Sequence, residues 1–267
     1  MKTIFCFIFY FFISYLTIAK AQTDTSFWFV APEITKASSN LDRPILMRIT
    51  AYSISSIVKI TQPANSNFPT QTISINSNSV ATINLTNWID IIENKPANTI
   101  LNYGFKITST NPVTIYYEIS SANNPEIFVL KGNNALGTDF WISSQNFLDN
   151  STAYIPNTNS SFDLVATNDA TTVTIIPSND IIGHNKNIPF TIILNKGQTY
   201  SATAVSNLSG NHLNGSRVLS DKPIAITIKD DVLSGNLFGG FCADLGGDQI
   251  VPTKLLGTEY IAINGFL

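Results

Sequence analysis

Alternating apolar and polar positions dominate the chain from Ser26 onward, and this alternation predicts β-strands. Val, Ile, Thr, Phe and Tyr fill the runs, while clusters of Gly, Pro and Asn separate them at hairpin-like spacing. Helical periodicity is nearly absent, and the best candidate, residues 88–93, is a single turn within a loop. We therefore expect an all-β fold. The expected strands are residues 45–51, 56–61, 70–75, 79–85, 105–109, 112–119, 162–167, 171–176, 188–194 and 199–205.

The sequence repeats itself over a long interval. Ser26-Phe27-Trp28 recurs 113 residues later as Asp139-Phe140-Trp141. The run Leu136-Gly137-Thr138-Asp139-Phe140 recurs 120 residues later as Leu256-Gly257-Thr258-Glu259-Tyr260. Such self-similarity is typical of proteins built from repeated structural units.

A finer period lies within this repeat. Turns expected at Ser55-Ser56, Asn111-Pro112, Asn168-Asp169 and Lys222-Pro223 follow one another at intervals of 54 to 57 residues. A unit of about 57 residues with four strands resembles a propeller blade, and the equal spacing favours this interpretation. The alternative pairs two such units into one β-sandwich of about 113 residues, which gives two tandem sandwiches.

The first residues predict export from the cytoplasm. Lys2 precedes an apolar run over residues 4–18, which is shorter than the roughly 20 residues of a membrane-spanning helix. Ala19-Lys20-Ala21 supplies the small residues that a signal peptidase recognises. We expect cleavage after Ala21, a secreted or cell-surface protein, and no transmembrane segment in the mature chain.

The repeats and the signal divide the chain into four parts. We expect that it is the amino-terminal part of a larger protein, because a half-made β unit at residue 256 would leave an open sheet edge. The expected parts are a signal peptide (1–21), a first β repeat of two units (22–135), a second β repeat of two units (136–255) and the start of a truncated third repeat (256–267).

Composition narrows the class of protein. Charged residues make up 12% of the chain and aromatic residues 11%, so there is enough apolar surface to bury and disorder is excluded. The formal net charge of −3 argues against a nucleic-acid partner, which requires a basic face to displace counterions.

An Asp- and Gly-rich stretch over residues 229–249 is the best candidate for metal chemistry. Its aspartates Asp230, Asp231, Asp244 and Asp248 could gather oxygen ligands around Ca²⁺, although their spacing differs from that of an EF-hand loop. The alternative is a long solvated loop in which Asp and Gly form turns. No other cofactor is expected.

Catalytic constellations are sparse. His184 and His212 both lie in Gly- and Asn-rich sequence, where a surface-loop role is the simpler interpretation. The Gly-x-Ser-x-Gly elbow of α/β-hydrolases is absent from the sequence. We expect no catalytic residues and no enzymatic activity.

One ordered series of motifs runs through the chain. The motifs are residues 42–45, 93–98, 124–128, 130–138, 220–227, 248–252 and 256–260. This series resembles the amino-terminal region of large secreted Bacteroidetes proteins, whose domain is related to the amino-terminal domain of the IgG Fc-binding protein of mucus. The resemblance implies a cell-surface or secreted protein of adhesin type, often associated with type IX secretion and gliding. It supplies no catalytic residues.

The leading functional expectation is a non-enzymatic binding or adhesion module with an unidentified extracellular protein or glycan ligand. Exposed aromatic residues such as Trp88 or Phe238 are candidate contacts, with core packing as the alternative role. A structural spacer within a surface protein is a second possibility. A third is an exported glycan-active hydrolase, which would need two carboxylates about 5–10 Å apart among the four aspartates.

Overall fold

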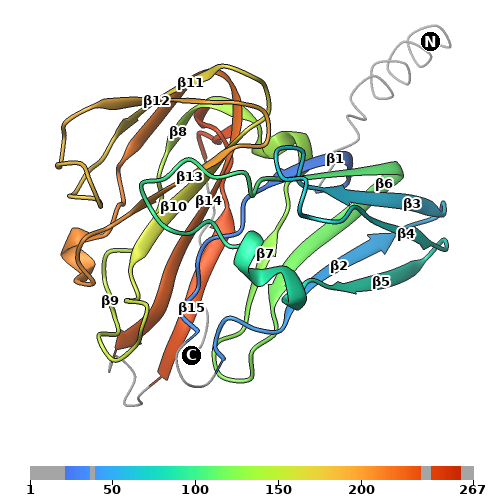
Figure 1. The fold of residues 1–267 in the computed structure, drawn as a ribbon, viewed down its shortest axis with the longest axis horizontal. Coiled ribbons are helices and arrows are strands. Elements are labelled where there is room, and N and C mark those ends of the chain that lie inside the picture. Colours follow the sequence, from blue (N-terminus) through green and yellow to red (C-terminus); the bar gives the residue numbers. More distant parts are fainter. Residues whose placement is uncertain (1–21, 37–39, 236–241, 260–267) are drawn as a thin grey trace, which may run out of the picture.

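The structure is a computed structural model that describes residues 22–36, 40–235 and 242–259. The expected signal peptide over residues 1–21 lies outside the described residues. Strands form nearly all of the regular structure, which confirms the all-β prediction (Figure 1). In the described part of the chain, no helix has the length and apolar character needed to cross a membrane.

The first seven strands form one sheet, which we call the first unit. Its order is β4-β3-β6-β2-β5, and β1 and β7 also pair with β6. Two short 3₁₀ helices, η1 (Thr86–Ile91) and η2 (Gly132–Ala135), lie in its connections. The strands are β1 (Asp24–Phe29), β2 (Ile45–Ala51), β3 (Ser56–Thr61), β4 (Gln71–Ile75), β5 (Ser79–Asn84), β6 (Phe105–Ile119) and β7 (Glu126–Val129).

The remaining strands form a second sheet, the second unit, with the same plan. Its order is β12-β11-β14-β10-β13, and β8, β9 and β15 also pair with β14. The strands are β8 (Gly137–Trp141), β9 (Asp149–Asn150), β10 (Ser160–Ala166), β11 (Thr171–Ile176), β12 (Phe190–Leu194), β13 (Thr199–Thr203), β14 (Arg217–Gly235) and β15 (Cys242–Gln249). The helices η3 (Ser209–Asn211) and η4 (Thr253–Leu255) complete it.

One long strand organises each unit. The first half of β6 pairs with β1 and β3, and its second half pairs with β2 and β7. Strand β14 changes partners in the same way, from β8 and β11 to β10 and β15. Each unit is therefore two four-stranded halves joined through one strand, with β9 as an additional short strand in the second unit.

The turns predicted at Asn111-Pro112 and Lys222-Pro223 are absent from the described structure. Both prolines lie within continuous strands, at the point where β6 and β14 change partners. Proline lacks an N–H donor, so it is tolerated where the ladder is interrupted. The sequence signal was real, but it marks a change of partner rather than a chain reversal.

Each unit encloses its own apolar core between its two halves. Inward side chains of β1, β2, β3 and β6 surround Phe29, whose ring centroid lies 4.9 Å from that of Tyr117. The second core gathers Phe140, Phe162 and other residues of β8, β10, β11, β13 and β14. Burial of these alternating side chains is the main stabilising contribution in each unit.

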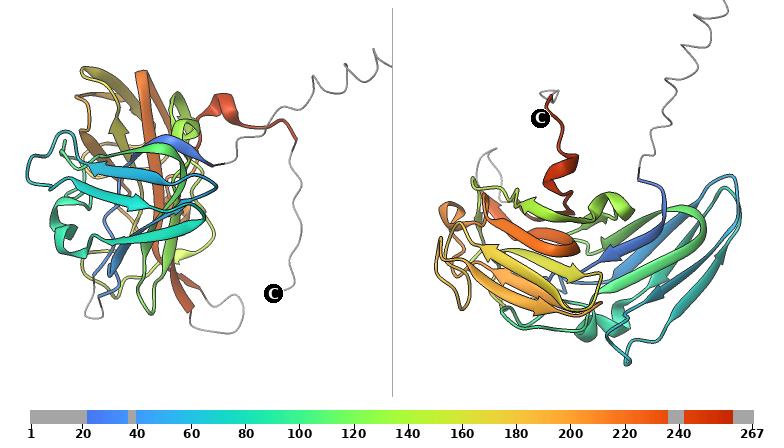
Figure 2. Two further views of the ribbon diagram at one scale, coloured as in Figure 1. Left: turned by 90° about the vertical axis from the view of Figure 1, so that its right-hand side faces the viewer. Right: turned by 90° about the horizontal axis from the view of Figure 1, so that it is seen from above.

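Strand pairing in the described residues agrees with the alternative of two tandem sandwich-like units. Strands join into a seven-stranded and an eight-stranded sheet rather than into separate four-stranded blades. Seen from above, the two units lie side by side as two lobes (Figure 2). The four-stranded period predicted from the sequence corresponds to the halves of these sheets.

The Asp- and Gly-rich stretch belongs largely to strands. Residues up to Gly235 continue β14, and Cys242–Gln249 form β15, which pairs with it. The alternative of a long solvated loop is therefore wrong for these residues. Ladder pairing overrides the local turn preference of Asp and Gly here. Residues 236–241, which include Phe238, lie outside the described residues.

Candidate binding groove at the junction of the two units

An apolar contact joins the two units. Trp28 and Val30 of the first unit pack with Ala135 against Val165 of β10 and Ala225 of β14. Strands β10 and β14 use alternate residues for their own core, so Val165 and Ala225 point to the opposite face of the sheet. This outer face of the second unit is covered by the first unit instead of by water.

Buried polar side chains surround this contact. Asn94 Nδ2 donates to Asp163 Oδ1 over 2.8 Å, and Thr199 Oγ1 donates to Asn94 Oδ1 over 2.7 Å. Burial raises the pKa of Asp163 to about 6, although hydrogen bonds from Asn94, Ser201 and Ser161 and the charge of Lys229 oppose the shift. These donors thus supply the hydrogen bonds that the buried carboxyl group of Asp163 no longer receives from water.

The chain before β6 is hydrogen-bonded along β13 of the other unit. Leu101 exchanges two backbone hydrogen bonds with Thr199, at 3.0 and 2.8 Å. Asn98 N donates to Ser201 O over 2.9 Å, and Gly104 N donates to Gly197 O over 3.1 Å. These contacts fix the position of the connecting loop relative to the second unit.

A buried carboxylate and a half-buried amine lie at the start of this loop. Lys95 Nζ donates to Glu93 Oε2 over 2.8 Å, and Ile34 N donates to Glu93 Oε1 over 3.2 Å. Burial raises the pKa of Glu93 to about 7, with Lys95 as the main opposing influence. Partial burial disfavours the charged form of Lys95, but the carboxyl groups of Glu93, Glu33 and Asp90 together raise the pKa of its amine.

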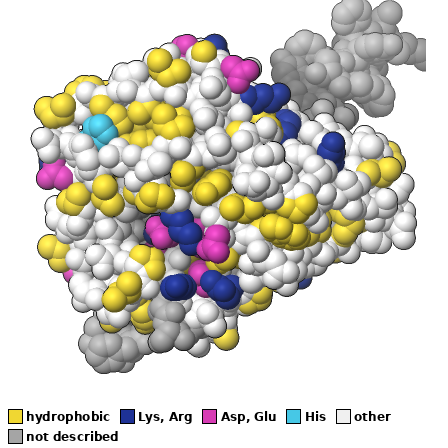
Figure 3. Space-filling view, in the orientation of Figure 1, with side chains coloured by type: hydrophobic (Ala, Val, Ile, Leu, Met, Phe, Trp, Pro, Cys, Tyr) yellow, Lys and Arg dark blue, Asp and Glu magenta, His cyan; other side chains and the backbone are white. Residues whose placement is uncertain are grey.

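A groove of about 570 Å³ lies beside this pair and is lined by both units. Its size is within the range of sites that hold ligands. Acidic, basic and hydrophobic side chains gather near the junction of the two lobes on the face of Figure 1 (Figure 3). The lining residues are Glu33, Lys95, Pro96, Ala97, Pro156, Asn157, Asn159, Ile182, Thr203 and Val205.

The groove combines apolar contact with polar specificity. Ile182 and Val205 are exposed large apolar side chains, and Lys95 places its amine nearby. Asn159 is buried, and its Oδ1 has no hydrogen-bond partner within the described structure. An unpaired buried acceptor is costly, so a ligand donor that reached it would be bound favourably.

The four aspartates proposed for calcium do not share one environment. Asp230 and Asp231 are buried on β14, whereas Asp244 is exposed on β15 and Asp248 is paired with Lys131 at 2.5 Å. Asp231 Oδ2 accepts from Thr35 N over 2.7 Å. Among described residues, no group of three or more Asp, Glu, His or Cys side chains is placed to hold a metal ion. Calcium binding stays a prediction, which unfolding temperatures in calcium and in EDTA would test.

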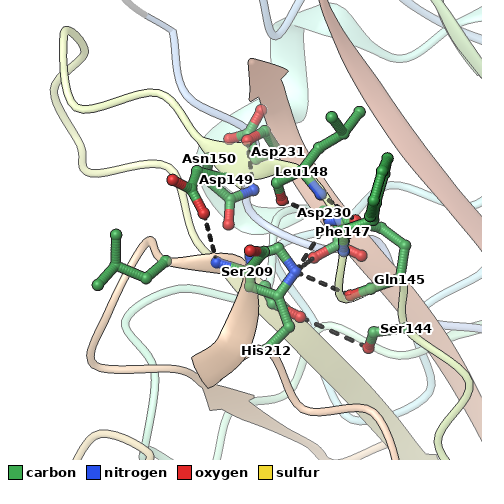
Figure 4. Close-up of polar contacts among 12 residues, drawn as sticks. Ser144, Gln145, Phe147, Leu148, Asp149, Asn150, Ser209, His212, Asp230 and Asp231 are labelled. Atoms are coloured by element: carbon green, nitrogen blue, oxygen red, sulfur yellow. Dashed lines mark hydrogen bonds and ion pairs between the residues drawn. The ribbon is translucent and has the colours of Figure 1, made fainter. Parts of the chain in front are cut away.

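His212 belongs to a buried network rather than to a surface loop (Figure 4). Its Nδ1 lies 3.1 Å from Asp230 Oδ1 and 2.9 Å from the carbonyl oxygen of Gln145. Burial disfavours the imidazolium, but Asp230 and the carbonyls of Gln145 and Asn207 together raise the pKa of His212. The surface interpretation was wrong for His212, because its side chain is buried and lies against Gln145 and Asp230.

The other sequence candidates have packing roles. His184 is half-buried and stacks on Phe190, with ring centroids 3.5 Å apart. Trp88 is also half-buried and packs edge-on against Phe68 at 5.8 Å. Core packing, the alternative stated for the aromatic candidates, is therefore the role of Trp88.

The groove residues were not identified from the sequence. Lys95, Pro96 and Ala97 line the groove and were noted only as part of the motif at residues 93–98, since nothing in their local pattern marks a junction between units. The available signal was the pair of opposite charges on Glu93 and Lys95, which are separated by one residue. This pair indicates a site only when the unit that faces it is known.

Comparison with known proteins gives one match. No curated protein and no solved structure matches the chain. Residues 126–266, more than half of the chain, match the family IgGFc_binding, described as IgGFc binding protein. The match extends over the second unit. It includes the groove residues that lie in the loops of this unit and the one that lies on β13. The chain therefore belongs to the IgGFc_binding family.

Proposed function

We propose that this protein is an extracellular, non-enzymatic binding module that holds a protein ligand in the groove between its two units. Membership of a family described as IgGFc binding protein is the observation that carries the proposal. We choose the groove as the location of the ligand, because residues of both units line it and Asn159 Oδ1 is a buried acceptor without a partner there.

A polypeptide is the ligand that the groove chemistry fits best. Apolar side chains such as Pro156, Ile182 and Val205 can contact side chains of a peptide, and Thr203 and the Asn159 amide can hydrogen-bond its backbone. Lys95 and Glu33 would then favour a peptide that carries groups of opposite charge to theirs at one end of the groove. Secretion and adhesion at a cell surface are part of the same proposal, supported by the sequence features of residues 1–21 and the family resemblance.

The test is a binding screen followed by matched variants. The purified protein is probed against an array of purified secreted proteins that includes the IgG Fc fragment, with a glycan array in parallel. Saturable binding to a protein, weakened at least tenfold by Val205→Arg and unchanged by Ile193→Arg, would support the proposal. Both side chains are exposed, but Ile193 lies on β12 and does not line the groove.

Other results would redirect the assignment. No binder above background on either array would contradict the proposal and favour a structural spacer. Protein binding that Val205→Arg leaves intact would place the ligand elsewhere on the molecule.

A further inference from the structure

A buried lysine and a buried aspartate lie side by side on the face of β14 that the first unit covers. Alternation along the strand places Lys229 and Asp231 on the same face as Ala225, which packs at the junction. Lys229 is 5% exposed and Asp231 is 1% exposed. Lys229 Nζ lies 3.7 Å from Asp231 Oδ2, which is close enough for an ion pair but too long for a hydrogen bond. The contact therefore offsets only part of the cost of removing the ammonium group from water.

The backbone holds the aspartate in this position at a conformational cost. The pairing of β14 with β15 shifts in register between Asp230 and Leu233, and Val232 within this irregularity has a φ of 46°. A β-branched residue rarely adopts a positive φ, and strain of this kind gathers at functional sites. Thr35 N of the first unit donates to Asp231 Oδ2 over 2.7 Å. Both units therefore orient the carboxyl group.

The third member of the group is Asn124, in the connection between β6 and β7 of the first unit. It is 1% exposed, and neither atom of its amide group has a hydrogen-bond partner within the described structure. Burial raises the pKa of the Asp231 carboxyl, and Lys229, Thr35 and Asn124 lie close enough to oppose this shift. Among the described residues, Asp231 Oδ1 also lacks a hydrogen-bond partner. An amide and a carboxyl group are thus buried together with unused hydrogen-bonding capacity, which is costly.

We propose that the Lys229 amine and the Asn124 side-chain amide form an isopeptide bond, with Asp231 as the group that transfers the protons. The three side chains supply the nucleophile, the acyl group and the acid–base group that this reaction requires. Their burial favours the reaction, because water competes neither for the carbonyl carbon nor for the amine. One bond would remove both a buried ammonium group and an unpartnered amide from the junction.

The reaction needs no external reagent. The Lys229 ammonium gives one proton to the Asp231 carboxylate, and the free amine attacks Asn124 Cγ. The Nζ–Cγ bond forms, and the amide oxygen takes up the negative charge. Asp231 then gives its proton to the departing nitrogen, the Cγ–Nδ2 bond breaks, and the carboxylate takes the surplus proton from Nζ. The products are a secondary amide, a protonated Asp231 carboxyl group and one molecule of ammonia.

The bond would join the two units covalently. Asn124 belongs to the first unit and Lys229 to the second, so the link closes a loop of about 100 residues and constrains the unfolded chain as a disulfide does. The three side chains do not line the ligand groove, so the inference is independent of the proposed function.

Mass spectrometry of the intact, purified mature protein is the first test. The reaction releases ammonia, so we expect a mass about 17 Da below that of the unmodified chain. An amino-terminal glutamine such as Gln22 can lose ammonia as well, so a tryptic digest is also sequenced by tandem mass spectrometry. We expect one branched peptide that contains both Asn124 and Lys229.

Three variants test the chemistry. Asn124→Ala lacks the acyl group, and Lys229→Arg lacks the amine. Asp231→Asn keeps the shape of the side chain but cannot transfer protons. Each variant should lose the branched peptide completely, whereas Asn123→Ala, at the exposed neighbouring position, should keep it. Unfolding temperatures verify that each variant is folded.

A denaturing gel gives an independent readout with the native side chains in place. A protease site inserted at the exposed residues 152–153 allows the chain to be cut between Asn124 and Lys229. The two fragments should stay joined in denaturant, and Lys229→Arg should release them. A digest of the wild-type protein without the branched peptide, native fragments that separate after cutting, or a link that persists in Asp231→Asn would each overturn the proposal.

Discussion

Asn94 of the first unit donates a hydrogen bond to Asp163 of the second over 2.8 Å, and both side chains are buried. The contact joins residues 69 positions apart and lies beside the apolar junction at Trp28. A buried carboxyl group at a junction needs such donors, because water no longer solvates it. The relative position of the two units is therefore specified by polar pairing as well as by apolar packing.

Removing this donor should weaken the whole protein. Asn94→Ala leaves Asp163 without one of its hydrogen bonds and Thr199 without its acceptor. We expect the free energy of unfolding to fall by about 1–3 kcal/mol, as measured by urea denaturation. Asn134→Ala, at an exposed position, is the control and should change stability by less than about 0.5 kcal/mol. Equal effects of the two substitutions would contradict the role given to Asn94.

Stability should fall as the pH rises from about 4 to about 7. Burial raises the pKa of Glu93 to about 7 and that of Asp163 to about 6. A raised pKa means that the folded state binds more protons between the unfolded and folded pKa values, so ΔG of unfolding decreases with pH there. The stability is present below the unfolded pKa values and is lost as the pH rises through the folded ones.

Calorimetry at pH 5 and pH 8 would measure this effect. We expect a higher unfolding temperature at pH 5, and a smaller difference in Asp163→Asn, which keeps an acceptor for Asn94 but cannot ionise. Each raised pKa corresponds to a contribution on the order of 3 kcal/mol. A difference that is unchanged in Asp163→Asn would show that this carboxyl is not responsible.

Close backbone approach gives a third prediction. A Cβ at Gly104 would lie 2.3 Å from Val165 Cγ2 and 2.8 Å from Gly197 O, across the junction. Gly104→Ala should therefore lower the free energy of unfolding by about 1–3 kcal/mol. A Cβ at Gly210 meets no atom within 4 Å, so Gly210→Ala should be nearly neutral. Urea denaturation of both variants checks the comparison, and a neutral Gly104→Ala would contradict the tight junction.

Local pattern predicted the strands well, because alternation of apolar side chains acts within a few residues. The predicted bounds 45–51, 56–61 and 171–176 match β2, β3 and β11. Pro112 was misread as a turn, since the sequence does not show that a strand changes partners at its proline. Asp163 lies on the outer face of β10, where alternation predicts solvent. Only the arrangement of the two units places Asn94 against it.

Coupling between His212 and Asp230 should depend on pH. The pKa of His212 is raised, so its charged form adds stability that is present at low pH and is lost as the pH rises through the folded pKa. A double-mutant cycle of His212→Ala and Asp230→Ala should give a coupling energy of about 0.5–3 kcal/mol at pH 5.5 and less at pH 8.5. Titration of groups outside the pair cancels in the cycle, so Glu93 and Asp163 do not mimic the effect. His184 contacts Asn98 and Phe190 instead, and His184→Ala should be additive with Asp230→Ala. A coupling energy that stays constant with pH would show that the pair contributes through packing and not through the imidazolium charge.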